Sequence, residues 1–84
     1  MSMYETVQID ACRGDQLVVS GTLKSKATVM LLSEQNHEEC VAVLKGLSEL
    51  GIMPCTAMDA LSAEHSRALF AVPESGKWFI LYQP

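Results

Sequence analysis

The segment from Asp59 to Ser66 gathers side chains of the types that carry out acid–base and nucleophilic chemistry. It contains Asp59, Ser62, Glu64, His65 and Ser66. A histidine is the usual general base near neutral pH. No strained nucleophile turn is visible here, however, and polar side chains also gather in ordinary loops. A small enzyme that uses His65 or a cysteine is therefore our third hypothesis, and we predict that the chain is not an enzyme.

The three cysteines, Cys12, Cys40 and Cys55, are the other reactive side chains. His37 and Cys40 are three residues apart, so on a helix they would share a face and could bind zinc with Cys12 or Cys55. The spacing matches none of the paired patterns of structural zinc sites. Cys40 also falls within an apolar stripe, where free cysteine behaves as a small hydrophobic residue. We therefore predict no metal and no cofactor.

The cysteine count also indicates a compartment. Small secreted domains usually carry several disulfide bonds, and an odd number of cysteines cannot all pair within one chain. The first residues lack the basic start and apolar run of a signal peptide. These features predict a cytoplasmic protein.

Charge and composition exclude several classes of partner. The net charge is −4, with six basic residues among 84. Binding to nucleic acid depends on Lys and Arg that neutralise phosphates, so we predict no nucleic-acid partner and no membrane partner. The five glycines are isolated, so no phosphate-binding loop is present. An apolar fraction of 49% and a length of 84 residues indicate one globular domain, residues 1–84.

Strands are predicted near both ends of the chain from the alternation of apolar and polar residues. The predicted strands cover residues 4–11, 17–23, 67–72 and 77–82. The first two are expected to pair as a hairpin around a turn at Arg13–Asp15. The last two are expected to pair as a closing hairpin around Pro73–Gly76. The continuous apolar run Thr28–Leu32 is typical of a strand covered on both faces.

A single main helix is predicted over residues 37–50. Asn36 suits the N-cap and Gly51 suits a left-handed residue after the last turn. The apolar stripe at helical spacing consists of Cys40, Val43, Leu44, Leu47 and Leu50. Residues 52–57 are expected to form a strand that is an edge or that pairs only beyond Pro54, because proline cannot donate to a ladder. Residues 59–66 fit either a helical turn or a loop.

The predicted fold is α+β, with a single antiparallel sheet of five to six strands in the order β-β-β-α-β-β-β packed on this helix. Such a sheet is roughly 20–25 Å wide, and one helix is only about 10 Å across. The second face could be covered by strong curling of the sheet, by residues 59–66 or by a second copy. We predict a homodimer, because closed twofold dimers are the commonest oligomers.

The predicted interface has two parts. The closing strand is apolar on both faces, and Trp78, Ile80 and Tyr82 form the face expected to meet the partner. Ala42 and Gly46 stack one turn apart on the helix, which would allow another backbone to approach closely.

The leading functional hypothesis is a non-catalytic protein-interaction or regulatory module that acts as a homodimer or bound to another protein. The alternative is a domain that binds a small ligand in a pocket near residues 59–66, with His65, Trp78 and Tyr82 as its lining. The sequence does not identify the partner or the ligand.

Overall fold

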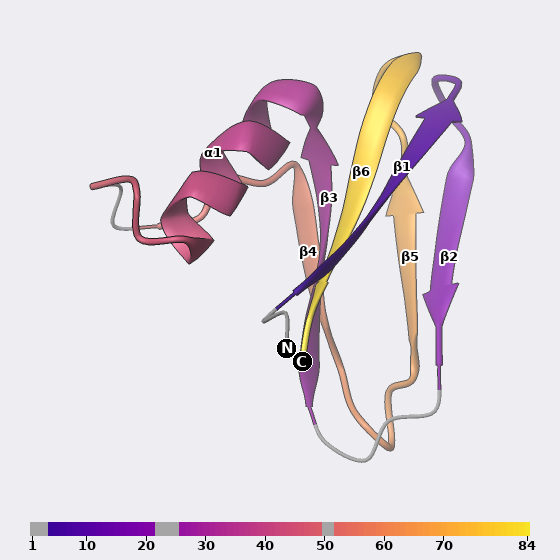
Figure 1. Cartoon of the computed structure of the whole chain (residues 1–84). Coiled ribbons are helices and arrows are strands. Elements are labelled where there is room, and N and C mark those ends of the chain that lie inside the picture. The colour runs from indigo at the N-terminus through magenta and orange to yellow at the C-terminus, as the bar shows by residue number, and fades with distance from the viewer. Residues whose placement is uncertain (1–3, 22–25, 50–51) are drawn as a thin grey trace.

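The computed structural model describes residues 4–21, 26–49 and 52–84 of the 84-residue chain. Within these residues, six strands and one helix follow in the expected order. Their bounds are β1 Glu5–Ala11, β2 Gln16–Ser20, β3 Ala27–Ser33, α1 Glu34–Leu44, β4 Ala57–Leu61, β5 Arg67–Ala71 and β6 Gly76–Gln83 (Figure 1). The predicted α+β class is confirmed. No helix in the described part of the chain is long and apolar enough to cross a membrane.

The strands form two sheets, so the prediction of a single sheet of five to six strands is wrong in this respect. One sheet has the order β1-β6-β3-β4, and the other pairs β2 with β5. Neither predicted hairpin forms, because β1 pairs with β6 and β2 pairs with β5. The first two strands of the chain are therefore paired with its last two strands.

A single register runs through both of these ladders. Ala11 lies opposite Gly76 in the first, and Gln16 lies opposite Ala71 in the second. Residues 12–15 and 72–75 separate the ladders by the same length on both sides. The two hairpins expected from the sequence are thus replaced by one long two-stranded ribbon that bends in its middle.

Backbone hydrogen bonds hold the bend together. The Gly14 N–H donates to the Val72 carbonyl, and the Val72 N–H donates to the Asp15 carbonyl, both at 2.9 Å. The Arg13 N–H donates to Ser75 Oγ at 2.9 Å. Gly14 has a φ of +90°, a backbone conformation that residues with a Cβ rarely adopt. The backbone conformation at the bend therefore favours glycine at position 14.

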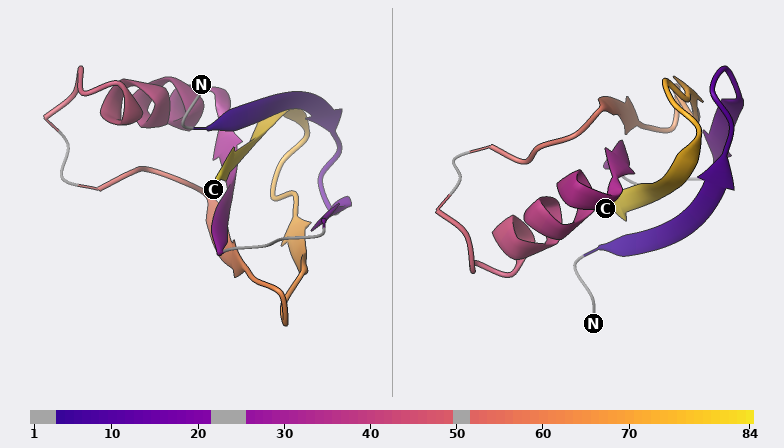
Figure 2. Two further views of the ribbon diagram at one scale, coloured as in Figure 1. Left: turned by 60° about the horizontal axis from the view of Figure 1, so that its bottom comes forward. Right: turned by 90° about the horizontal axis from the view of Figure 1, so that it is seen from above.

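The bent ribbon encloses the larger of the two cores. Its β2–β5 half packs over one face of the four-stranded sheet, and Figure 2 shows that helix α1 lies on the other side of that sheet. The buried residues between the two sheets are Ala11, Val29, Leu31, Leu61, Ala68, Phe70, Val72 and Trp78. The second face is thus covered within one chain by curling of the sheet, one of the three possibilities raised by the sequence.

Helix α1 covers the opposite face over β3 and β6. This smaller core consists of the buried residues Met30, Leu32, Cys40 and Leu81, with Tyr4, Leu44, Met53, Cys55 and Phe79 packed around them. Strand β3 contributes to both cores, which explains its continuous apolar sequence. The prediction that this strand is covered on both faces is confirmed.

The helix begins and ends earlier than the predicted 37–50. Ser33, the last residue of β3, is the N-cap instead of Asn36, and its Oγ accepts a hydrogen bond from the Asn36 N–H. At the other end, Gly46 has a φ of +72°, its N–H donates to the Val43 carbonyl, and the next N–H, of Leu47, donates to the Ala42 carbonyl. This pair of bonds is a Schellman motif. The predicted end at Gly51 lies outside the described residues.

Two further boundaries differ from the prediction. Residues 52–56 form no strand, and the strand after the helix is β4, at Ala57–Leu61. It starts beyond Pro54, which cannot donate to a ladder. Residues 59–61 of the ambiguous segment 59–66 are therefore strand, and the rest is the turn into β5. Strand β2 ends at Ser20, and residues 22–23 of its predicted extension lie outside the described part.

The bend gives a stability prediction with a matched control. Gly14→Ala forces a Cβ onto a left-handed backbone, and it should lower the free energy of unfolding by about 1–2 kcal/mol. Gly21→Ala should be neutral or slightly stabilising, because no positive φ is found there and no atom lies within 4 Å of the added Cβ. Urea unfolding of both variants measures the difference. Equal stability of the two variants would contradict the proposed role of Gly14.

Candidate functional site

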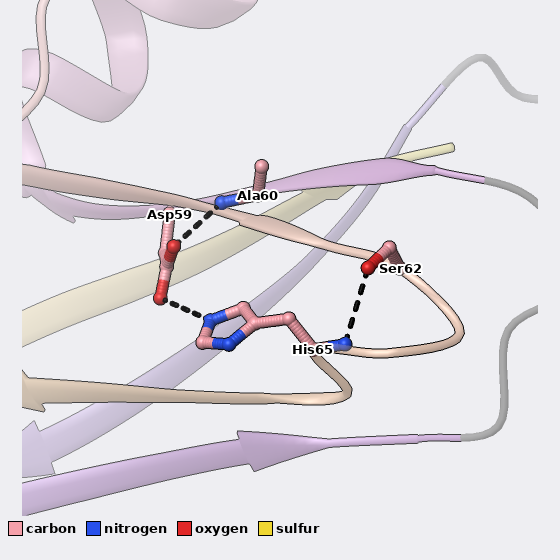
Figure 3. A network of polar contacts seen from close by, with 4 residues as sticks. All are labelled: Asp59, Ala60, Ser62 and His65. Carbon is pink, nitrogen blue, oxygen red and sulfur yellow. Dashed lines mark hydrogen bonds and ion pairs between the residues drawn. The ribbon is translucent and has the colours of Figure 1, made fainter.

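Asp59 and His65 form a polar network between β4 and the turn that leads into β5. His65 Nε2 lies 3.1 Å from Asp59 Oδ2, and the other carboxylate oxygen, Oδ1, accepts a hydrogen bond of 2.8 Å from the Ala60 N–H (Figure 3). Both side chains remain in contact with solvent, with 58% of His65 and 39% of Asp59 exposed. The hydrogen bond to His65, followed by the one from Ala60, lowers the pKa of Asp59 below its ordinary value.

The other polar side chain of this network has a structural role. Ser62 Oγ accepts a hydrogen bond of 3.1 Å from the backbone N–H of His65, and the Ser62 N–H donates to the His65 carbonyl. Ser62 thus folds the turn, and its hydrogen bond is to the backbone of His65 and not to the imidazole ring. A nucleophile activated by a base requires a hydrogen bond from the hydroxyl to the ring. The contacts of Ser62 therefore differ from those of a catalytic serine.

The network lies on one edge of the four-stranded sheet. Strand β4 is the last strand on this side, and edge strands carry unpaired backbone groups that can bind another strand. The Asp59 carboxylate occupies the Ala60 N–H, and His65 holds that carboxylate in place from the neighbouring turn. Strand β5 also contacts β4. A charged side chain on an edge strand is a common protection against pairing with another chain.

The structure places two of the three predicted ligand-binding residues apart along β6. Trp78 is buried near the bend, 7% exposed, and its indole N–H donates to the Glu74 carbonyl at 2.9 Å. Tyr82 is four residues further along β6, about 13 Å away, and lies opposite Val29. His65 lies on the turn between β4 and β5.

The predicted interface residues have different surroundings from those expected. Trp78 belongs to the core between the two sheets, and Ile80 and Tyr82 pack partly buried against it. Ala42 is half-buried on α1, whereas Gly46 follows the helix as its left-handed cap. The uncovered face that motivated this interface is occupied by the β2–β5 sheet of the same chain.

The cysteines and histidines form no metal site in the described residues, since no three residues among His, Cys, Asp and Glu converge there. Cys40 is fully buried, and its thiol lies 3.6 Å from Met53 Sδ. Burial raises the pKa of the Cys40 thiol, with a smaller contribution from Cys55. The placement of Cys40 in the core agrees with the sequence interpretation, and Cys12 is exposed at the bend.

His37 joins the helix to the sheet. Its ring stacks on Phe79 of β6 with a centroid distance of 4.0 Å and an angle of 6° between the planes. Its Nε2 lies 3.1 Å from Thr6 Oγ1 in β1, within hydrogen-bond distance. Burial lowers the pKa of His37 from its ordinary value of 6.5, and the neighbouring Glu38 carboxylate partly opposes this effect. The neutral imidazole is therefore the form that the folded chain favours.

A shallow hollow lies at the ends of three strands of the sheet. Its volume is about 240 Å³, and it is lined by Lys26, Ala27, Thr28, Ala60, Gln83 and Pro84. Sites for small molecules usually exceed about 300 Å³. The hollow lies close to the predicted 59–66 region through Ala60, but His65, Trp78 and Tyr82 do not line it.

The other edge of the four-stranded sheet, β1, is open. Strand β1 pairs with β6 on one side, and in Figures 1 and 2 no other described element runs along its outer side. Residues 5–8 are all exposed, and Val7 retains 58% of its surface. Between Glu5 and Asp10 the strand carries no charge. The sequence analysis missed this edge because alternation predicts a strand but not its neighbours.

The Asp59–His65 contact gives a titration prediction. In His65→Phe the pKa of Asp59 should rise toward its ordinary value, because the phenyl ring cannot donate the hydrogen bond that is the largest cause of the lowering. NMR titration of the Asp59 carboxyl carbon measures the change. Glu64→Gln, a substitution in the same turn, is the control and should leave the Asp59 titration in place. An unchanged Asp59 pKa in His65→Phe would show that the contact does not form in solution.

The partly buried imidazole of His37 gives a prediction for stability against pH. The pKa of His37 is lower in the folded chain than in the unfolded chain, so its contribution is complete above pH 6.5 and is lost as the pH falls below that value. His37→Phe keeps an aromatic ring on Phe79 but cannot titrate. Between about pH 8 and pH 5 the melting temperature of the variant should therefore fall less than that of the native chain. Parallel pH profiles of the two proteins would contradict this assignment.

Comparisons with known proteins identify no family or function for the chain. The chain matches no protein-family model, no curated protein and no solved structure. Among the described residues, the contrast between the two edges of the four-stranded sheet is the feature that bears on function.

Proposed function

We propose that this chain is a non-catalytic protein-interaction module that binds its partner by adding a strand to the open edge of β1. The observation that carries the proposal is that side chains contact the backbone at the β4 edge of the four-stranded sheet but not at the β1 edge, among the described residues. On β4 the Asp59 carboxylate occupies the Ala60 N–H, whereas no other described strand pairs with the outer side of the seven residues of β1. A sheet edge without protection pairs readily with another extended chain.

The chemistry of β1 suits strand addition. The main-chain N–H and C=O groups of an edge strand supply the affinity, and alternate side chains supply the specificity. Val7 and Ile9 lie on the face toward the larger core, whereas Thr6 and Gln8 lie on the helix face. The edge therefore offers an apolar row on one face and a hydrogen-bonding row on the other.

The polar clusters that suggested catalysis have structural contacts that account for them. The hydroxyl of Ser62 and the ring of His65 bind different partners within the turn, and the thiol of Cys40 lies in the core. These contacts support a binding role over an enzymatic one. We place the module in the cytoplasm, because its three cysteines are free and a reducing compartment keeps thiols in that state.

Selection of extended peptides tests the strand-addition proposal. A phage-displayed library of random peptides, selected on the immobilised full chain, should yield peptides that bind in the extended conformation. Successive residues of a strand point their N–H groups to opposite sides. Of Val7→Pro and Gln8→Pro, one variant therefore removes an N–H on the outer side and keeps the hydrogen bonds to β6. The variant with native circular dichroism should bind the peptides at least about tenfold more weakly.

Val18→Lys on β2 is the matched control and should bind the selected peptides as the native chain does. Peptides that bind equally well to the folded proline variant, or a selection that yields none, would overturn the proposal. The chain is immobilised at low density, so that a second copy does not compete with the peptides for the β1 edge.

A further inference from the structure

We propose that the partner strand is β1 of a second copy, paired antiparallel about a twofold axis at Gln8, so that two four-stranded sheets become one of eight strands. The inference rests on the proposed function and names its partner. It follows from three properties of β1: its length, its symmetry when paired with itself, and the positions of its two acidic residues.

Symmetry restricts the possible registers. A twofold axis between two antiparallel edge strands is perpendicular to the sheet, so both helices lie on the same side of the joined sheet. Residues that lie opposite each other then belong to the same face, and the axis must pass through a residue rather than between two residues. For β1 the centre of the strand, Gln8, is the only axis position that pairs all seven residues Glu5–Ala11.

The pairs formed in this register are compatible in both charge and polarity. Gln8 lies opposite its own copy, Val7 opposite Ile9, Thr6 opposite Asp10 and Glu5 opposite Ala11. Val7, now 58% exposed, would pack on the partly buried Ile9 of the other copy on the face of the larger core. The Thr6 and Gln8 pairs would place hydrogen-bonding side chains together on the helix face.

The acidic residues favour this register over others that symmetry allows. An axis at Glu5 or at Asp10 would set two carboxylates directly opposite each other, which destabilises a pair of strands. With the axis at Gln8, both acids face uncharged residues. An axis at Val7 or at Ile9 also avoids the clash but pairs five residues of β1 instead of seven. The register at Gln8 therefore combines the longest ladder with no repulsion between like charges.

The association should be moderate in strength. Seven residues of strand span about 23 Å, and the contact is confined to one edge of a small domain. Interfaces at the low end of the size range usually give dissociation constants of about micromolar or weaker. Self-association should therefore appear in sedimentation velocity between about 10 and 200 μM.

A charge exchange at the axis tests the proposal. Gln8 is exposed, so both Gln8→Lys and Gln8→Glu should fold. Each variant alone would place two like charges about 5 Å apart across the axis and should sediment as a monomer. An equimolar mixture of the two should recover the dimer, because every heterodimer then sets a lysine opposite a glutamate. Val18→Lys is the control on β2 and should dimerise as the native chain does.

The outcomes separate this inference from the proposed function. Recovery of the dimer only in the mixture supports the register. A native chain that is monomeric at 200 μM, or Gln8→Lys protein that dimerises as well as the native chain, overturns pairing between copies at Gln8. In either case peptide binding that depends on β1 would leave the proposed function standing with a different partner. Dimers lost in Val18→Lys and kept in both Gln8 variants would instead assign the interface to β2.

Discussion

The pairing of the beginning of the chain with its end is the interaction on which the rest of this structure depends. Strands β1 and β2 run in one register along β6 and β5, and the ribbon bends once, where Gly14 adopts its left-handed backbone. Through this bend the β2–β5 half folds back over the four-stranded sheet and encloses the larger core. Without it, β3 and β6 would be covered on the helix face alone.

The bend also explains where the surplus apolar residues of a small acidic chain are placed. Trp78 and Phe70 come from strands on the two sides of the bend, and they meet in one core within a single copy. The sequence suggested that a partner should cover this face, but the chain covers it by curling. One part left open is the outer edge of β1, with which no described strand pairs.

The sequence predicts the elements of this fold better than it predicts their pairing. The apolar run of β3 indicates a strand covered on both faces, because apolar side chains on both faces of a strand are enough to predict that both faces are buried. The alternation in β1 and β6 is equally clear, but alternation is a local property, and neighbours in the sequence are only the commonest partners of a strand. The hairpin prediction failed because the turns at Gly14 and at Ser75 join the two sheets instead of reversing the chain within one.

The helix ends show a second limit of local patterns. Ser33 and Asn36 are both good caps, and Ser33 takes this position because the chain passes from β3 into α1 without a loop. Gly46 and Gly51 are both suitable terminators, and the helix ends at the first. Among the candidate site residues, His65 does form a polar contact, as its sequence neighbourhood suggested, with Asp59 of the same segment. That contact lies across the turn from β4 to β5, and residue types alone do not show whether it protects an edge or carries out chemistry.

The central claim is that the fold leaves β1 free and that a second β1 occupies it. An isotope-filtered NOE experiment on an equal mixture of ¹³C-labelled and unlabelled chains observes contacts between copies only. The account predicts cross-peaks that join Val7 of one copy to Ile9 of the other, together with contacts between the two Gln8 residues. Intermolecular cross-peaks confined to other elements, or none at a concentration of about 1 mM, would contradict it.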